Sequence, residues 1–142
     1  LVTADRAIWQ PLWRGYLAFY QASLPPDIDG ITFSRLTSGT EPMGGFIAED
    51  DTGRAVGFVH WVKHRTCWTE KDNCYLQDLF VLSETRGGGH GRALIEAVYA
   101  KASEMGMARV YWQTQESNGT AQKLYDRIAD KSGFIVYRKA IG

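Results

Sequence analysis

The sequence lacks the features that mark several large classes of protein. Among 142 residues it has only two cysteines, Cys67 and Cys74, too few for a disulfide framework or a four-ligand zinc site. Its 16 basic and 16 acidic side chains cancel, so no positive charge excess points to nucleic acid or an anionic membrane. No apolar run approaches the ~20 residues of a membrane span. We therefore expect a cytoplasmic protein with reduced thiols, no metal, no nucleic acid and no membrane attachment.

The N-terminal stretch has no basic start followed by an apolar segment, so no signal peptide is expected. The chain does not begin with Met, which suggests that a few N-terminal residues are missing. With a hydrophobic content of 44%, 142 residues are enough to bury one core. We therefore expect residues 1–142 to form a single domain.

Hydrophobic periodicity predicts that helices and strands are mixed along the chain. A first helix in residues 4–24 would place Ile8, Leu12, Tyr16, Phe19 and Tyr20 on one face and end at the prolines 25 and 26. The predicted strands cover residues 43–50, 54–66, 73–82, 108–115 and 134–141, with a hairpin turn between the first two and burial on both faces for the third. Further helices are predicted in residues 27–38, after the glycines near position 90, and in residues 117–133.

The predicted third helix follows a run of glycines and would bury Leu94, Val98, Ala102 and Met105. Glycines let successive backbone N–H groups converge, and a helix start adds partial positive charge, so this turn suits a phosphate. The dinucleotide pattern G-x-G-x-x-G fails at Leu94, and no P-loop G-K-S/T follows. A flexible surface turn before an ordinary helix is the structural alternative.

The pattern that remains is Arg86-x-x-Gly89-x-Gly91. Residues 75–98, YLQDLFVLSETRGGGHGRALIEAV, resemble the acetyl-coenzyme A (acetyl-CoA) site of the GCN5-related N-acetyltransferases, whose pattern is Arg/Gln-x-x-Gly-x-Gly/Ala. Residues 114–134 resemble the second signature of that family, with Asn118 and Tyr125 at the matching positions. The order of elements agrees along nearly the whole chain.

One subgroup of this family is the most similar. The stretch YLQDLF, with His64 and Trp68 upstream, resembles the polyamine, diamine and yeast Hpa-type amino-group acetyltransferases. The resemblance implies an α/β fold in which helices flank a central, mixed and mostly antiparallel sheet. It also implies acetyl-CoA as the cosubstrate.

The resemblance assigns roles to the residues around the glycines. The backbone of Leu79, Phe80 and Val81 would pair with the pantetheine arm, while Arg86 would lie near the phosphates or brace the turn. The amides that would hold the pyrophosphate belong to Gly87, Gly88, Gly89, His90, Gly91 and Arg92. Asn118 would bond to the pantetheine arm or to the helix start, and its residue type alone also predicts a plain helix N-cap.

By resemblance, Tyr125 protonates the departing coenzyme A thiolate. The residues alone leave another interpretation open, because Tyr125 lies on the apolar face of its predicted helix and could simply pack in the core. A proton must also leave the acceptor, since making an alkyl amine neutral at pH 7 costs ~4.6 kcal/mol.

The residue that accepts this proton stays open. The polyamine branch has Glu where this chain has Gln77, which cannot act as a base but can orient water or the amine. Strand alternation points the neighbouring Asp78 to the opposite face unless a β-bulge intervenes, and Asp78 could instead be a buried structural acid. His60, His64, Glu116 and a water relay are further candidates.

The sequence therefore predicts an N-acetyltransferase that moves an acetyl group from acetyl-CoA to a small-molecule primary amine by direct attack. An amino acid, a diamine or a polyamine would be the acceptor. The alternatives are a protein or peptide Lys or N-terminal acetyltransferase, a non-catalytic acyl-CoA sensor, and a generic nucleotide-phosphate binder. By analogy with the family, the apolar final strand would also suit a homodimer.

Overall fold

The computed structural model describes residues 1–142 and separates into two units, residues 1–112 and 113–142. The first unit is built on a four-stranded sheet in the order β1-β2-β3-β4. Its strands are β1 (Met43–Glu49), β2 (Ala55–His64), β3 (Asn73–Val81) and β4 (Arg109–Tyr111). β1, β2 and β3 pair antiparallel, and β4 pairs with β3 in parallel. This confirms the expected mixed, mostly antiparallel sheet.

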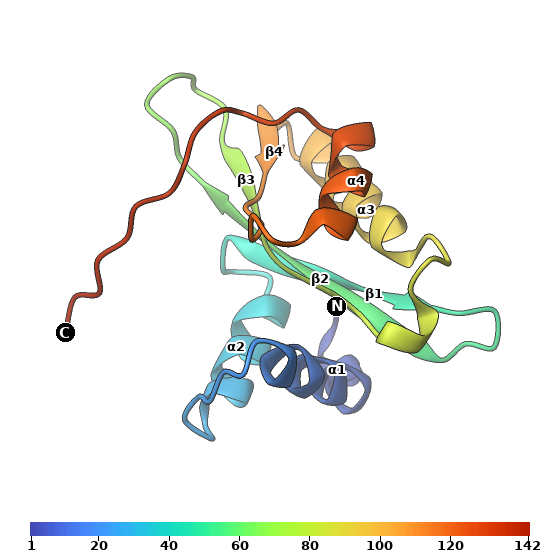
Figure 1. Ribbon diagram of the computed structural model, residues 1–142. Coiled ribbons are helices and arrows are strands. Elements are labelled where there is room, and N and C mark those ends of the chain that lie inside the picture. The colour runs from blue at the N-terminus through green and yellow to red at the C-terminus, as the bar shows by residue number, and fades with distance from the viewer. The chain divides into compact units, whose positions relative to one another are not determined.

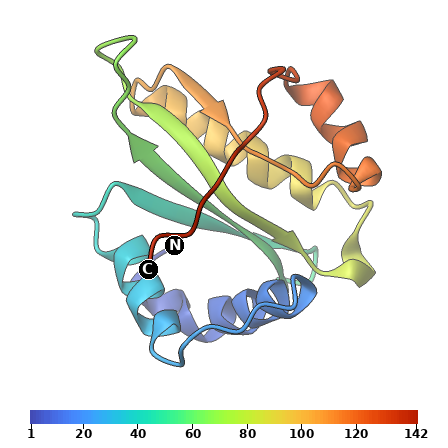
Figure 2. The ribbon, with the colours of Figure 1, turned by 60° about the vertical axis from the view of Figure 1, so that its left-hand side comes forward.

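Helices cover both faces of this sheet (Figures 1 and 2). α1 (Arg6–Phe19) and α2 (Ile28–Thr37) lie on one face, and α3 (His90–Glu104) lies on the other. Short 3-10 turns, η1 (Thr3–Asp5) and η2 (Ser83–Thr85), precede α1 and follow β3. α3 carries the chain from β3 across to β4, which a parallel strand pair requires. The predicted α/β class is therefore correct.

The core beneath α1 differs from the predicted helix face. Trp9, Leu12 and Trp13 are buried there against α2 and β2, whereas Ile8 and Phe19 are exposed. Apolar residues occur all round this helix, so the 3.6-residue period did not single out one face. Which face of α1 is buried depends on the side chains of α2 and β2 against which it packs.

The end of α1 and the inner face of α3 also differ from the prediction. α1 ends at Phe19, before the two prolines, because Gln21 takes a left-handed conformation with φ 54° and turns the chain away. α3 buries Leu94, Ile95, Val98 and Ala102 but leaves the predicted inner residue Met105 exposed. It ends as predicted at Gly106, whose positive φ of 68° suits a glycine at this position.

The second unit contains one helix, α4 (Gly119–Ile128). It stops at Ile128, before Gly133, and no strand forms in residues 134–141, so the predicted final strand is wrong. The apolar side chains of this segment, such as Phe134 and Tyr137, are exposed. Its composition favours a strand, but a strand also needs a partner for its backbone groups, and the unit holds no other strand.

None of the helices combines the length and apolarity that crossing a membrane requires.

Candidate active site

The central strand of the candidate site, β3, contains a β-bulge at Gln77. Asp78 pairs with His60 on β2, whereas Leu76 pairs with Trp61, so Gln77 has no partner across the ladder. His60 and Trp61 are consecutive and point to opposite faces, so Leu76 and Asp78 also point to opposite faces. Leu76 is buried, whereas Gln77 is exposed, and the predicted burial of this strand on both faces is therefore wrong.

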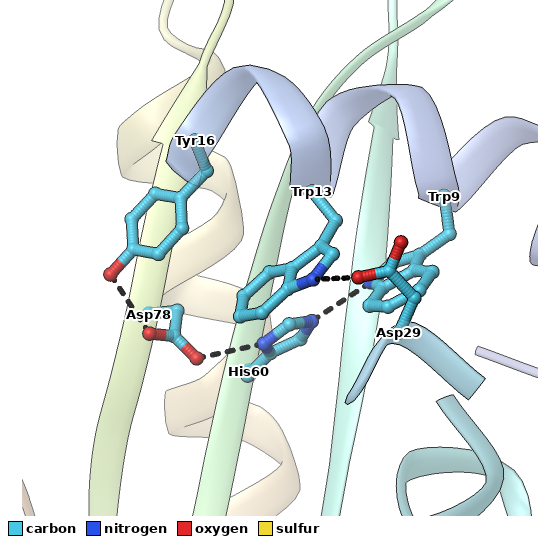
Figure 3. Close-up of polar contacts among 6 residues, drawn as sticks. All are labelled: Trp9, Trp13, Tyr16, Asp29, His60 and Asp78. Atoms are coloured by element: carbon cyan, nitrogen blue, oxygen red, sulfur yellow. Dashed lines mark hydrogen bonds and ion pairs between the residues drawn. The ribbon is translucent and has the colours of Figure 1, made fainter. Parts of the chain in front are cut away.

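The bulge turns Asp78 toward α1. The hydroxyl of Tyr16 donates to Asp78 Oδ1 at 2.8 Å, and Nδ1 of His60 lies 2.9 Å from Asp78 Oδ2 (Figure 3). Both carboxylate oxygens therefore accept a bond from a neighbouring element. Burial and the adjacent Asp78 carboxylate raise the pKa of Tyr16 far above its ordinary value, which keeps the phenol protonated as a donor. This arrangement fits the structural role that the sequence left open for Asp78.

The position of the proton on His60 follows from its partners. Nε1 of Trp9 lies 3.0 Å from His60 Nε2 (Figure 3), and an indole N–H only donates, so Nε2 accepts. The proton of the neutral ring then sits on Nδ1 and is donated to Asp78. His60 is 2% exposed, and both of its nitrogens are engaged. In this geometry His60 cannot act as the base that the sequence considered.

A second carboxylate holds α1 to α2. Asp29 Oδ1 accepts from Trp13 Nε1 at 3.1 Å, and Asp29 Oδ2 lies 2.6 Å from the Arg14 guanidinium and accepts from Gln10 at 3.1 Å. Figure 3 shows Trp9 and Trp13 side by side above these acceptors. From α1, Asp29 thus has both oxygens satisfied and Asp78 has one, so this helix is fixed in rotation and register.

One edge of β3 is open beside the bulge. β4 pairs with β3 only from Asn73 to Tyr75, the latter opposite Tyr111. Beyond Tyr75 the two strands no longer pair, so β4 leaves the edge of β3 uncovered alongside Leu79, Phe80 and Val81, where the Val81 carbonyl accepts from the Arg86 side chain. Unpaired strand groups accept an extended partner as an added strand. The residues predicted to pair with the pantetheine arm thus have the free edge that such pairing needs.

The glycine turn connects this strand to α3. Gly87 and Gly89 have φ angles of 90° and 82°, which favour glycine, and Gly89 is the N-cap of the helix. The first-turn amides, at His90, Gly91 and Arg92, have no acceptor within the helix and are available to an anion. The Gly88 amide instead donates to the carbonyl of Thr85 at 3.3 Å.

Arg86 braces the turn. Its Nε donates to the carbonyl of Val81 at 3.4 Å, and its guanidinium lies 5.4 Å from the ring centre of Phe19 at the end of α1. The side chain thereby links the end of β3 to α1 across the start of the loop. Of the two roles that the resemblance allowed for Arg86, this geometry displays the bracing one.

The remaining two predicted residues lie on or beside α4. The side chain of Asn118 accepts from the Ala121 amide at 3.3 Å, so Asn118 is a helix N-cap, as its residue type predicted. Tyr125 is half-buried on the same helix. Nearby, the Gln122 side chain donates to the carbonyls of Gln115 and Glu116.

Sequence reasoning missed two members of the network around Asp78. Trp9 was not singled out, and Tyr16 was assigned only to an apolar face. The signal available was their spacing, because positions 9, 13 and 16 fall on one helical face and each carries a polar atom at the tip of an aromatic ring. Nothing local in the sequence says which acceptors they meet.

Comparison with known proteins identifies the family. The sequence model of the acetyltransferase (GNAT) family matches residues 7–129, which run from α1 to the end of α4. The chain belongs to the GNAT family. This also confirms the dependence on acetyl-CoA, which the family uses as acetyl donor.

Individual relatives agree with this assignment. The D-amino-acid N-acetyltransferase HPA3 of Saccharomyces cerevisiae is 38% identical over 136 residues, which cover 95% of this chain and 84% of the relative. The uncharacterized N-acetyltransferase YhfO of Bacillus subtilis is 30% identical, with 95% and 91% covered. HPA3 bears out the subgroup that the sequence indicated.

A solved structure shows the same fold. The aminoglycoside enzyme AAC(6')-Iy, in complex with a bisubstrate analogue of coenzyme A, matches with a TM-score of 0.83 at 20% identity. The match covers 99% of this chain and 95% of that one. The chain is therefore an acetyl-CoA-dependent N-acetyltransferase by family, and its fold agrees with that family.

Proposed function

We propose that this N-acetyltransferase acts on the primary amine of a small molecule and that its acceptor is an amino acid. The relation to a D-amino-acid N-acetyltransferase over nearly the whole chain carries this proposal. Diamines and polyamines remain the nearest alternatives within the same chemistry. Because the family match spans both units, we also propose that residues 1–142 act as one catalytic domain. A homodimer and a cytoplasmic location stay predictions.

In this proposal the acetyl donor is bound mainly by backbone. The free edge at Leu79, Phe80 and Val81 would pair with the pantetheine arm, and the amides from Gly87 to Arg92 would hold the pyrophosphate. A backbone N–H of β3 would donate to the thioester carbonyl and stabilise the charge that develops on its oxygen. Such contacts fix the reacting carbon without any side chain of β3, so they tolerate the change from Glu to Gln77.

The acceptor would approach beside the bulge. Gln77 is exposed there, and its amide can orient the amine or a water molecule without taking a proton. Asp78 would act through its charge, because both of its oxygens already accept hydrogen bonds. After the amine lone pair attacks the thioester carbonyl, the C–S bond breaks, and Tyr125 would give its proton to the departing thiolate. The nitrogen, which carries an extra proton after the attack, loses it to solvent, and the Tyr125 phenolate takes a proton back from solvent.

The experiment that tests this proposal offers acetyl-CoA and a panel of acceptors to the purified chain. The panel holds D- and L-amino acids, diamines, polyamines and Lys-containing peptides, and the acetylated product is detected by mass spectrometry. Direct product detection is preferable to a thiol reagent, because the exposed Cys67 would react as well. Binding of acetyl-CoA is measured in parallel by calorimetry.

We expect acetylated amino acids as the main product. Acetylation of the peptides alone would contradict a small-molecule acceptor, and a preference for polyamines would contradict the amino-acid class. Binding of acetyl-CoA without transfer to any member of the panel would contradict the proposed function as a whole. A reaction without acceptor measures thioester hydrolysis and is subtracted.

A further inference from the structure

A second polar pair lies at the far end of β2, where the sheet begins to open. Nε2 of His64 lies 2.6 Å from the hydroxyl of Tyr111, and Nδ1 of His64 lies 2.8 Å from the carbonyl oxygen of Arg65. The two rings meet edge to face, with 5.7 Å between their centres. His64 belongs to β2 and Tyr111 is the last residue of β4, so the contact spans the strand between them.

The partners of His64 define its tautomer. A backbone carbonyl only accepts, so His64 Nδ1 carries a proton and donates a hydrogen bond to the carbonyl oxygen of Arg65. In the neutral ring, Nε2 then has a free lone pair, and the Tyr111 hydroxyl donates to it. This is the arrangement of a hydroxyl activated by an oriented imidazole, with the carbonyl as the group that fixes the ring.

The pair stands next to the proposed acetyl-donor track. Tyr111 is opposite Tyr75 in the last paired position of β3 and β4, and the two rings lie 5.0 Å apart. The open edge of β3 begins at the next residue, Leu76. Strand pairing puts Tyr75 on the same face as Val62 and therefore as His60 and His64, and the bulge puts Asp78 on that face as well.

The other acid–base candidates of this unit are already engaged. Both nitrogens of His60 and both oxygens of Asp78 are held in the buried network. Tyr111, by contrast, is 40% exposed, and His64 is only half-buried. Of these groups, only the pair at the opening of the sheet can both meet an incoming amine and pass a proton on to solvent.

We propose that Tyr111 and His64 form the dyad that takes the proton from the acceptor ammonium; this rests on the proposed function. An N–H bond of the ammonium breaks and its proton moves to Tyr111 Oη. In the same step the Tyr111 O–H bond breaks and that proton moves to His64 Nε2. The amine gains its lone pair, Tyr111 stays a neutral phenol, and His64 becomes an imidazolium that returns its proton to water.

The charged and titratable neighbours of the dyad are few. From β3, Tyr75 faces Tyr111, and Cys74 lies beside it on the opposite face of the strand. Burial raises the pKa of both, that of Cys74 to about 11, so both stay neutral near pH 7. Asp78 lies on the same strand beyond Tyr75. In the loop between β2 and β3, the carboxylate of Asp72 forms ion pairs with the side chains of Arg65 and Lys63, at 3.4 and 3.8 Å.

The test uses the variants His64→Gln, Tyr111→Phe and their combination, with kcat measured from pH 6 to pH 10. We expect each single variant to lower kcat at neutral pH by roughly 100-fold, within the range of general base catalysis. The double variant should lose about as much as either single one, because the two groups act as a unit. The kcat of His64→Gln should rise with pH and approach that of the unaltered chain, because a larger share of the amine is already neutral at high pH.

Tyr75→Phe is the matched control, since the Tyr75 ring packs against that of Tyr111 but takes no part in the dyad. It should keep kcat, and all variants should keep their affinity for acetyl-CoA. Undiminished kcat of His64→Gln at neutral pH would overturn the dyad, as would fully additive losses in the double variant. Absence of transfer by the unaltered chain would instead contradict the proposed function.

Discussion

The indole N–H of Trp9 donates to Nε2 of His60 at 3.0 Å, and this one bond settles where the imidazole proton sits. Because Nε2 is occupied, His60 donates through Nδ1 to Asp78, which also accepts from Tyr16. Four side chains from α1, β2 and β3 thus form a chain of donors and acceptors without an unpaired member. A network that is satisfied throughout fixes one arrangement of the elements that carry it.

Replacing Trp9 with Phe should reveal how much this network contributes to stability. Trp9→Phe removes the indole N–H and leaves His60 Nε2 buried without a donor, which costs ~1–3 kcal/mol. The smaller ring adds a cavity, so we expect a loss of about 2–4 kcal/mol in urea unfolding. Trp68→Phe is the matched control, because Trp68 is 93% exposed, and it should change the unfolding free energy by less than ~0.5 kcal/mol. Equal losses in both variants would contradict the role of the bond.

The same network shows where prediction from the sequence stopped. The order of elements from α1 to α4 followed from periodicity and from the glycines, since these signals are local. The buried face of α1 did not, because Ile8 and Trp9 are both apolar and the choice depends on partners more than 40 positions away in the chain. The final strand failed for a related reason, since composition favours a strand but cannot supply its pairing partner.

The glycine turn offers a prediction with a close internal control. Gly89 and Gly53 have φ angles of 82° and 84°, and an added Cβ would meet nothing within 4 Å at either position. Alanine should therefore cost each site ~1–2 kcal/mol of conformational strain. Only Gly89→Ala should also raise the KM for acetyl-CoA, by roughly tenfold for a loss of ~1.4 kcal/mol in binding. A similar rise in Gly53→Ala, which lies in the β1–β2 turn, would assign the effect to general destabilisation.

The candidate site was predictable in part. The glycine pattern marks the start of α3, where the first-turn amides have no acceptor within the helix, and the strand before it is the one that β4 leaves partly unpaired. The surroundings of Asp78 were not predictable, because a β-bulge is set by the pairing of two strands and leaves no signature in β3 alone. The contact between His64 and Tyr111 joins strands that are not neighbours in the sheet, so no local pattern announces it.

Tyr125 tests the second half of the reaction. If its phenol gives a proton to the departing thiolate, Tyr125→Phe should lower kcat by roughly 100-fold or more while acetyl-CoA binds as before. Tyr137→Phe provides the control, because this tyrosine belongs to the same unit and is 90% exposed. Steady-state kinetics and calorimetry on both variants separate turnover from binding. Equal turnover in Tyr125→Phe and in the unaltered chain would remove Tyr125 from the mechanism.

The two cysteines should differ in reactivity and in their effect on alkaline stability. Cys67 is exposed on the loop between β2 and β3, whereas Cys74 is 1% exposed on β3. Iodoacetamide should therefore modify one thiol in the folded chain and both after unfolding, as counted by mass spectrometry.

Burial raises the pKa of Cys74 from 9.0 to about 11, so above pH 9 the unfolded chain loses this proton before the folded one does. The folded state binds more protons there, and stability must fall as pH rises from about 9 to 11. In urea unfolding measured at each pH, the free energy of unfolding should fall less with pH in Cys74→Ala than in Cys67→Ala. Tyrosines whose pKa is also raised by burial, such as Tyr16, lower the free energy of unfolding in the same direction in both variants. Identical slopes in the two variants would show that the Cys74 thiol titrates alike in the folded and unfolded chains.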